Sequence, residues 1–215
     1  MFLKNSEINR FKKTLLLTEK NIKYNFLKYF ILSLIIILIT PVIFGTQNLD
    51  SRASAIPLEF FIALTGIILI TPLFFPENDA GTDELITSKY FENSFVYTIR
   101  IIYAVLTLFL LILFFVFYLK LNNCTVNFYH IYGTFSSALF LGSLGLITSA
   151  LIKNNAVPYM IPLIYFMLNF SGGSKLGKFY IFGMSSGIFE GKIFLLVSGF
   201  VLIISAVLIK KYSEK

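Results

Sequence analysis

Six apolar stretches divide this chain, and they constrain its fold more than any other feature of the sequence. A straight helix needs about 20 residues to cross about 30 Å of hydrocarbon. The second, third and fourth stretches reach that length, and the first reaches it when its flanks are counted. We therefore expect an all-α membrane protein with six transmembrane helices. The predicted spans are 28–44, 56–75, 94–119, 132–152, 155–170 and 192–209.

The composition favours the same class of protein. Of the 215 residues, 57% are hydrophobic and 13% are charged, and the mean hydropathy is +0.81. A soluble domain of this size needs more polar residues to cover its surface. The net charge of +7 does not indicate a nucleic-acid partner, because the basic residues lie at the ends and in the loops around the apolar stretches. The single cysteine, Cys124, excludes an intramolecular disulfide and a Cys-based zinc site.

The distribution of Lys and Arg predicts that both termini are cytoplasmic. Inner loops of membrane proteins carry an excess of these two residues, whereas Asp and Glu have little influence on orientation. With the N-terminus inside, the inner side holds most of the 18 basic residues. The outer side then holds Arg52, Lys120, Lys175, Lys178 and Lys192.

Residues 1–27 are predicted to form an amphipathic helix that lies in the membrane surface. Its apolar residues recur at helical spacing: they are Ile8, Phe11, Leu15, Ile22 and Phe26. Its other faces carry basic residues: Arg10, Lys12, Lys13, Lys20 and Lys23. A basic amphipathic helix places its apolar face in the lipid boundary and its lysines near anionic headgroups. Membrane lipid is therefore the expected partner of this helix, and a solvated leader is the alternative.

The longest polar interval, residues 76–93, joins the second and third spans on the inner side. It contains five of the 11 acidic residues: Glu77, Asp79, Asp83, Glu84 and Glu92. Pro76 ends the preceding span. Asp79 can cap a short helix, and Asp83 lies in its opening turns, where negative charge suits the helix dipole. A short acidic helix held by a span on either side indicates a docking device, and a solvated turn is the alternative.

Near the predicted start of the second span, Pro57 suits a first helical turn and Glu59 lies in the same turn. A carboxylate within the membrane can mark an ion pathway. At a helix N-terminus, however, an acid is favoured by the dipole and reaches water. We therefore expect Glu59 to lie near the outer headgroups, and we expect the spans to contain no paired charges at depth.

The fourth span is rich in small residues, namely Ala138, Gly142, Gly145 and Ser149. Such residues allow helices to approach closely, so we expect tight packing inside the chain, with a subunit interface as the alternative. The fifth span is too short to cross straight. Residues 171–191 after it are neither a hydrophilic loop nor a full span, and they predict a broken re-entrant element on the outer side. A row of glycines, Gly183, Gly187 and Gly191, lies within it.

The sequence contains no motif for catalysis. Gly191-Lys192 lacks the remainder of a phosphate-binding loop and is followed by Ile193 rather than Ser or Thr. The lone His130 has no cysteine or histidine companions for a metal, so we expect an interfacial polar residue. We therefore expect a chain that is not itself an enzyme and that binds no metal or cofactor.

Taken together, these parts resemble the ABC-2 class of ABC transporter permeases. The resemblance rests on the order of the elements and on the inner-loop sequence E-N-D-A-G-T-D-E-L, Glu77 to Leu85. It implies that residues 1–27 are the elbow helix and that residues 28–215 form the six-helix transmembrane domain, in which 76–93 is the coupling loop. It implies an outer gate that includes Gly183, Gly187 and Gly191. The resemblance further implies a set of residues that dock the ATPase: Asp79, Gly81, Thr82, Asp83, Glu84, Leu85 and Ile86.

The resemblance also implies the partners of the chain and the place where it works. Two copies of a cytoplasmic ABC ATPase bind ATP and Mg²⁺, and a second permease subunit, the same or related, completes the transporter in the bacterial cytoplasmic membrane. The expected function is ATP-driven export of an amphipathic cargo, such as a toxin or bacteriocin-like peptide. Export of drugs, lipids or haem remains open, and so does a non-transporting scaffold or immunity protein. A self-sufficient channel or secondary transporter would require paired charges or an inverted repeat at the midplane.

Overall fold

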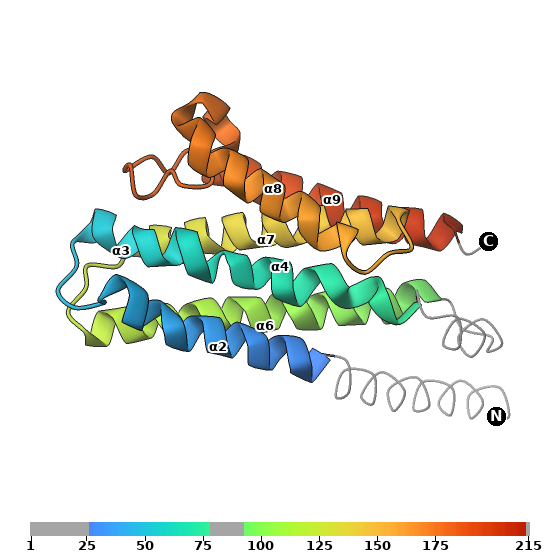
Figure 1. Ribbon diagram of the computed structural model, residues 1–215, viewed down its shortest axis with the longest axis horizontal. Coiled ribbons are helices and arrows are strands. Elements are labelled where there is room, and N and C mark those ends of the chain that lie inside the picture. Colours follow the sequence, from blue (N-terminus) through green and yellow to red (C-terminus); the bar gives the residue numbers. More distant parts are fainter. Residues whose placement is uncertain (1–25, 78–92, 214–215) are drawn as a thin grey trace, which may run out of the picture.

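The computed structural model describes residues 26–77 and 93–213, which form an elongated bundle of helices (Figure 1). Within these two ranges there is no strand, and five helices are long and apolar enough to cross a membrane. The chain is therefore a multi-pass helical membrane protein. The five are α2 (Leu27–Phe44), the composite span Ser51–Pro76, α6 (Asn93–Leu121), α7 (Phe128–Leu151) and α9 (Lys192–Ser213). The predicted elbow helix and most of the predicted coupling loop lie outside the described residues.

The second span is a chain of four short helical pieces rather than one regular helix. They are α3 (Ser51–Pro57), the π-helix η2 (Leu58–Ile62), α4 (Leu64–Ile70) and the 3₁₀ helix η3 (Thr71–Glu77). The prediction that Pro57 lies in the first turn is wrong. Asp50 caps the helix five residues earlier than predicted, because its carboxylate accepts a hydrogen bond from Ala53 N at 2.8 Å. Pro57 instead ends α3, and the backbone continues as a π-helical turn.

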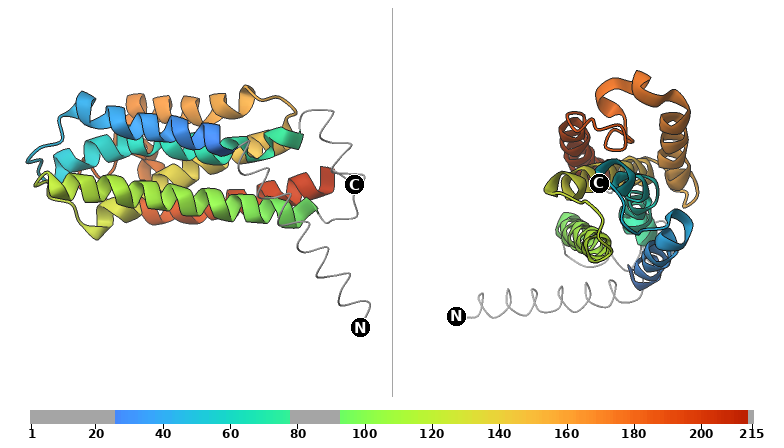
Figure 2. Two further views of the ribbon diagram at one scale, coloured as in Figure 1. Left: turned by 90° about the horizontal axis from the view of Figure 1, so that it is seen from below. Right: turned by 90° about the vertical axis from the view of Figure 1, so that its left-hand side faces the viewer.

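Helix α7 is the centre of the bundle, and it packs against α4, α8 and α9 (Figure 2). Most of its side chains from Gly133 to Ser149 are buried. In contrast, α2, α6, α8 and α9 expose many large apolar side chains, among them Val42, Phe117, Met167 and Ile204. Such faces are suited to lipid, which is the solvent of a membrane-spanning helix.

The prediction that the small residues of the fourth span pack inside the chain is confirmed. A Cβ added to Gly66 in α4 would collide with the backbone of Ala138 in α7. A Cβ added to Gly142 would meet Ile70, and one added to Gly145 would collide with the side chain of Thr71. The two helices therefore touch backbone to backbone along their crossing.

Helix α8 (Val157–Gly172) has 16 residues, about 24 Å at the usual rise, which is shorter than the hydrocarbon core. The expectation that the fifth stretch is too short to cross straight is thus confirmed. The 3₁₀ helix η4 (Gly173–Phe179) and a series of turns then lead to α9. We call residues 173–191 the α8–α9 connector.

The bundle has two distinct ends. The start of α2, the end of η3, the start of α6 and the end of α9 lie at one end, on the right of Figure 1, which we call the terminal end. The α8–α9 connector and the loops 45–50 and 122–127 lie at the other, the connector end. The described chain thus begins and ends on one side, as expected when the helices pass to and fro. The side of the membrane that each end faces stays a prediction.

Candidate functional site

Glycines shape the backbone of the α8–α9 connector. Gly173, Gly177 and Gly187 have φ values of 55°, 58° and 79°, which other residues rarely adopt. Residues 183–188 form a compact turn, in which Ile188 N donates to Gly183 O at 2.8 Å. The GxxxGxxxG row is therefore not a helix-packing stripe. Gly183 and Gly191 are instead positions where a Cβ would press against the backbone oxygens of Ile188 and Lys178.

The connector folds back onto the bundle and buries apolar side chains there. Figure 2 shows it arching from α8 on one side to α9 on the other. Ile181, Phe182 and Met184 are almost fully buried. Phe182 stacks on Phe60 of η2 with ring centroids 4.4 Å apart, and Phe166 of α8 meets it edge-on at 5.1 Å. Aromatic contacts therefore join the connector to two separate helices.

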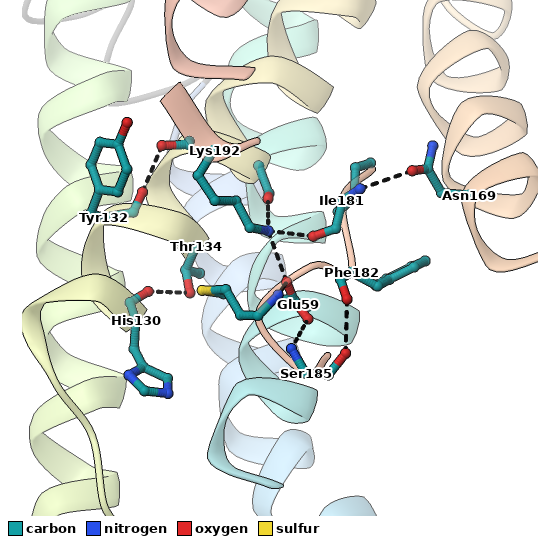
Figure 3. Close-up of polar contacts among 12 residues, drawn as sticks. Glu59, His130, Tyr132, Thr134, Asn169, Ile181, Phe182, Ser185 and Lys192 are labelled. Atoms are coloured by element: carbon teal, nitrogen blue, oxygen red, sulfur yellow. Dashed lines mark hydrogen bonds and ion pairs between the residues drawn. The ribbon is translucent and has the colours of Figure 1, made fainter. Parts of the chain in front are cut away.

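Glu59 lies beneath the connector and binds its backbone. The residue belongs to the π-helix η2, and its side chain is 0% exposed. The carboxylate accepts hydrogen bonds from Met184 N at 2.7 Å and from Ser185 N at 3.0 Å (Figure 3). π-Helical turns inside α-helices frequently occur at functional sites. Here the turn places an acid where it caps two amides of a segment 125 residues away in the chain.

Lys192, the first residue of α9, completes the site from the other side. Its side chain is 1% exposed, and Nζ lies 2.8 Å from Oε1 of Glu59. The same ammonium donates to Ser137 Oγ of α7 at 2.9 Å and to Ile181 O of the connector (Figure 3). A lysine has three donors, and each of them has a partner here. The pair thus joins η2, α7, the connector and α9 at one point.

The prediction that Glu59 reaches water is wrong, because its side chain is fully buried beneath the connector. Lys192 is buried as well, and its place among the outer basic residues stays a prediction. The two charges form a buried ion pair that the sequence analysis missed; the pair lies beside the connector and not at the depth where no paired charges were expected. Glu59 and Lys192 each lie at the edge of an apolar stretch, which is only a weak signal of an ion pair. They are 133 positions apart in the sequence, so their contact cannot be inferred from spacing.

Asn169 of α8 provides a further attachment that the sequence analysis missed. The side chain is fully buried. Its Oδ1 accepts from Ile181 N at 2.9 Å, and its Nδ2 donates to Tyr165 O of its own helix at 3.0 Å. Both the N–H and the C=O of Ile181 are therefore satisfied by buried side chains, from α8 and from α9 respectively.

His130 is buried in the first turn of α7. Nδ1 accepts a hydrogen bond from Asn127 N at 3.1 Å, which closes a capping box at the start of the helix. That bond assigns the proton to Nε2, which donates to Ser51 O at 2.8 Å. His130 therefore ties the first turn of α7 to the first turn of α3.

A hollow of about 250 Å³ lies beside the connector. Its walls come from the connector itself and from the first residue of α9. Lys178 is one of the wall residues, and its ammonium lies 4.3 Å from the centre of the Phe194 ring. The lining residues are Gly177, Lys178, Tyr180, Gly183, Ile188, Glu190, Gly191 and Lys192.

The described structure brings together only part of the site predicted from sequence. Gly183, Gly187 and Gly191 lie in the connector and shape its turns, and their role in an outer gate stays a prediction. The predicted ATPase-docking residues, Asp79 to Ile86, and the predicted membrane-surface residues, Arg10 to Lys23, lie outside the described residues. No family model, curated protein or solved structure matches this chain.

Proposed function

We propose that this chain is the membrane-spanning permease subunit of an ATP-driven exporter of the ABC-2 class. The observation that carries the proposal is the α8–α9 connector, a broken segment that folds back onto the bundle directly before the last helix. The resemblance stated above implies such an element as the outer closure of the transport path. Its place, opposite the end where the described chain begins and ends, supports this assignment.

In this proposal the terminal end of the bundle faces the cytoplasm of a bacterial cell. Glu77 at the end of η3 and Asn93 at the start of α6 both lie at that end (Figure 1). The loop between them is the coupling loop that docks a cytoplasmic ABC ATPase, two copies per transporter. ATP and Mg²⁺ bind to that partner. A second permease subunit completes the path across the membrane.

The proposed cargo is an amphipathic peptide of the toxin or bacteriocin type. In the described helices the Glu59–Lys192 pair is saturated by its own hydrogen bonds and leaves no charge free for a bare ion. The apolar contacts between the connector and the bundle are largely aromatic, with Phe60, Phe166 and Phe182 close together. Drug, lipid or haem export and a non-transporting scaffold or immunity role are the alternatives.

A pull-down from the native host tests the proposal. The tagged chain is purified in mild detergent, and ATP hydrolysis is measured on the eluate. We expect a soluble ATPase to co-purify with the wild type and to be lost from the Asp83→Lys/Glu84→Lys variant. Glu190→Lys, an exposed reversal at the connector end, is the matched control and should retain the ATPase. An eluate without ATPase in every variant would contradict the proposal.

A second candidate function is favoured by one observation, the buried Glu59–Lys192 pair. Ionisable residues inside membrane spans often belong to ion or proton pathways, so a gradient-driven transporter is the alternative. The pair lies next to the connector, since Lys192 is the first residue of α9, whereas midplane sites are typical of such transporters. Transport that persists without any ATPase and stops when the proton gradient is removed would favour this second function.

A further inference from the structure

Few polar contacts attach the α8–α9 connector to the bundle. At its start, Tyr165 Oη of α8 donates to Phe179 O at 2.7 Å; the turn that follows is held mainly by one ion pair. In the described chain, every hydrogen bond that joins residues 181–185 to another helix ends on Glu59, Lys192 or Asn169. Glu59 holds the amides of Met184 and Ser185, and Lys192 holds the carbonyl of Ile181. The two charged side chains therefore bind backbone groups on either side of Phe182 and Gly183, and they also form an ion pair with each other.

Glycines with positive φ lie on both sides of this turn. Gly177 has a φ of 58° and open space where a side chain would be. Gly187 has a φ of 79°, and the atoms nearest to where its Cβ would lie belong to the Arg52 side chain, at 3.6 Å or more. Glycine tolerates large changes of φ and ψ at little steric cost, and a few such positions suffice as a hinge. Gly177 and Gly187 thus flank residues 181–185, which form hydrogen bonds to the bundle, and they are the hinge positions of this segment.

We propose that Glu59 and Lys192 are positioning residues that hold residues 180–191 against the bundle, and that separating the two charges frees this segment. This inference rests on the proposed function, in which the segment is the moving part of the outer closure. Each charge acts through backbone groups of the segment, so the hold is independent of most side chains in it. Breaking the pair weakens three attachments at once, while the stacking of Phe182 on Phe60 remains.

Thiol labelling of the purified full-length protein in detergent tests this hold. All variants carry Cys124→Ser, which removes the single native thiol. Met184→Cys reports on the held turn, because Met184 is 1% exposed, and Ile188→Cys is the exposed reference in the same segment at 52%. Leu139→Cys reports on the core of α7, where Leu139 is fully buried. A hydrophilic maleimide is added, and the labelling rate is measured for each reporter.

We expect the double variant Glu59→Gln/Lys192→Met to raise the labelling rate of Met184→Cys by roughly tenfold or more. Losing a hydrogen bond to a charged group shifts the equilibrium of local opening by about that factor. Leu139→Cys should stay protected, because the bundle itself is unchanged. Lys192→Arg, which keeps the charge and the donors, should leave Met184→Cys protected. An unchanged labelling rate at Met184→Cys in the double variant would overturn the proposal.

If Leu139→Cys also becomes reactive in the double variant, the whole bundle has opened. The milder variant Glu59→Asp is then labelled with the same reporters to test the hold. Its shorter carboxylate keeps the charge opposite Lys192 but cannot span the same distance to both amides. Faster labelling of Met184→Cys with Leu139→Cys protected supports the hold, and wild-type protection at both positions overturns it. The labelling measurement uses no ATPase. A result that overturns the Glu59–Lys192 hold therefore leaves the permease proposal intact, and a pull-down without ATPase leaves the hold intact.

Discussion

At the scale of single residues, the buried Glu59–Lys192 pair must offset a large desolvation cost. Taking a carboxylate and an ammonium out of water costs several kcal/mol each, and their attraction offsets this only when further hydrogen bonds satisfy both groups. Glu59 has two backbone donors and Lys192 has two acceptors besides the pair itself. The pair is therefore tolerated because the connector and Ser137 provide what water would otherwise provide.

Removing one charge should destabilise the protein more than removing both. We expect Glu59→Gln to lower the free energy of unfolding by about 3–5 kcal/mol, because it leaves Lys192 as an uncompensated buried charge. Adding Lys192→Met should restore part of this loss, with a coupling energy of about 1–3 kcal/mol between the sites. Denaturant unfolding of the two single variants and the double variant measures it. Strictly additive losses would show that the pair is not coupled.

His130 gives a second prediction at this scale. His130→Leu removes both the cap on Asn127 N and the donor to Ser51 O, and should cost about 1–3 kcal/mol, because buried backbone groups lose their partners. His130→Gln should cost less, since a glutamine at this position of a helix can reach back to the cap amide. The midpoints of thermal unfolding compare the two. A larger loss for Gln than for Leu would contradict the assigned hydrogen bonds.

At the scale of elements, the sequence predicted lengths well and local backbone irregularities poorly. Apolar runs fix where helices lie, because a span must satisfy its backbone internally and face lipid. The start of the second span was misplaced because the cap of Asp50 outweighs the preference of Pro57 for a first turn. The π-helix at Leu58–Ile62 has no sequence signature of its own, and it carries the two residues, Glu59 and Phe60, that contact the connector.

The crossing of α4 and α7 gives a prediction for these elements. Gly66→Ala should lower stability by about 1–3 kcal/mol or more, because the added methyl group collides with the backbone of Ala138. Gly172→Ala is the matched control. Its added methyl group would meet only the flexible end of Leu176 at 3.2 Å, so it should change little. Equal unfolding midpoints for the two variants would show that the helices do not cross this closely.

At the scale of the whole molecule, the contacts that build the site join segments far apart in the chain. Glu59 and Lys192 are 133 residues apart, and Asn169 and Ile181 are connected through a reversal of the backbone. Periodicity and composition describe one element at a time, so they predicted the helices and the broken connector but not which side chains meet. The small-residue packing of α7 was predictable because small residues favour close approach whatever the partner.

The orientation of the bundle gives a prediction for the whole chain. Alkaline phosphatase fused after Asn123, in the loop at the connector end, should be active, because the predicted orientation places this fusion point outside the cell. The same enzyme fused after Asn154, in the loop between α7 and α8 at the terminal end, should be inactive. Phosphatase activity in intact bacterial cells, normalised to the amount of fusion protein, measures this. The opposite pattern would reverse the orientation and place the connector on the inner side.

Photo-crosslinking tests the central claim, that this chain delivers ATP-driven motion to a membrane path, most directly. A crosslinking amino acid is placed at Leu85 in the predicted coupling loop and, as a control, at Phe128 at the connector end, and living cells are irradiated. We predict that position 85 crosslinks to a soluble protein that hydrolyses ATP and that position 128 does not. If position 85 gives no adduct with an ATPase while the protein is inserted and folded, the chain is not an ABC permease.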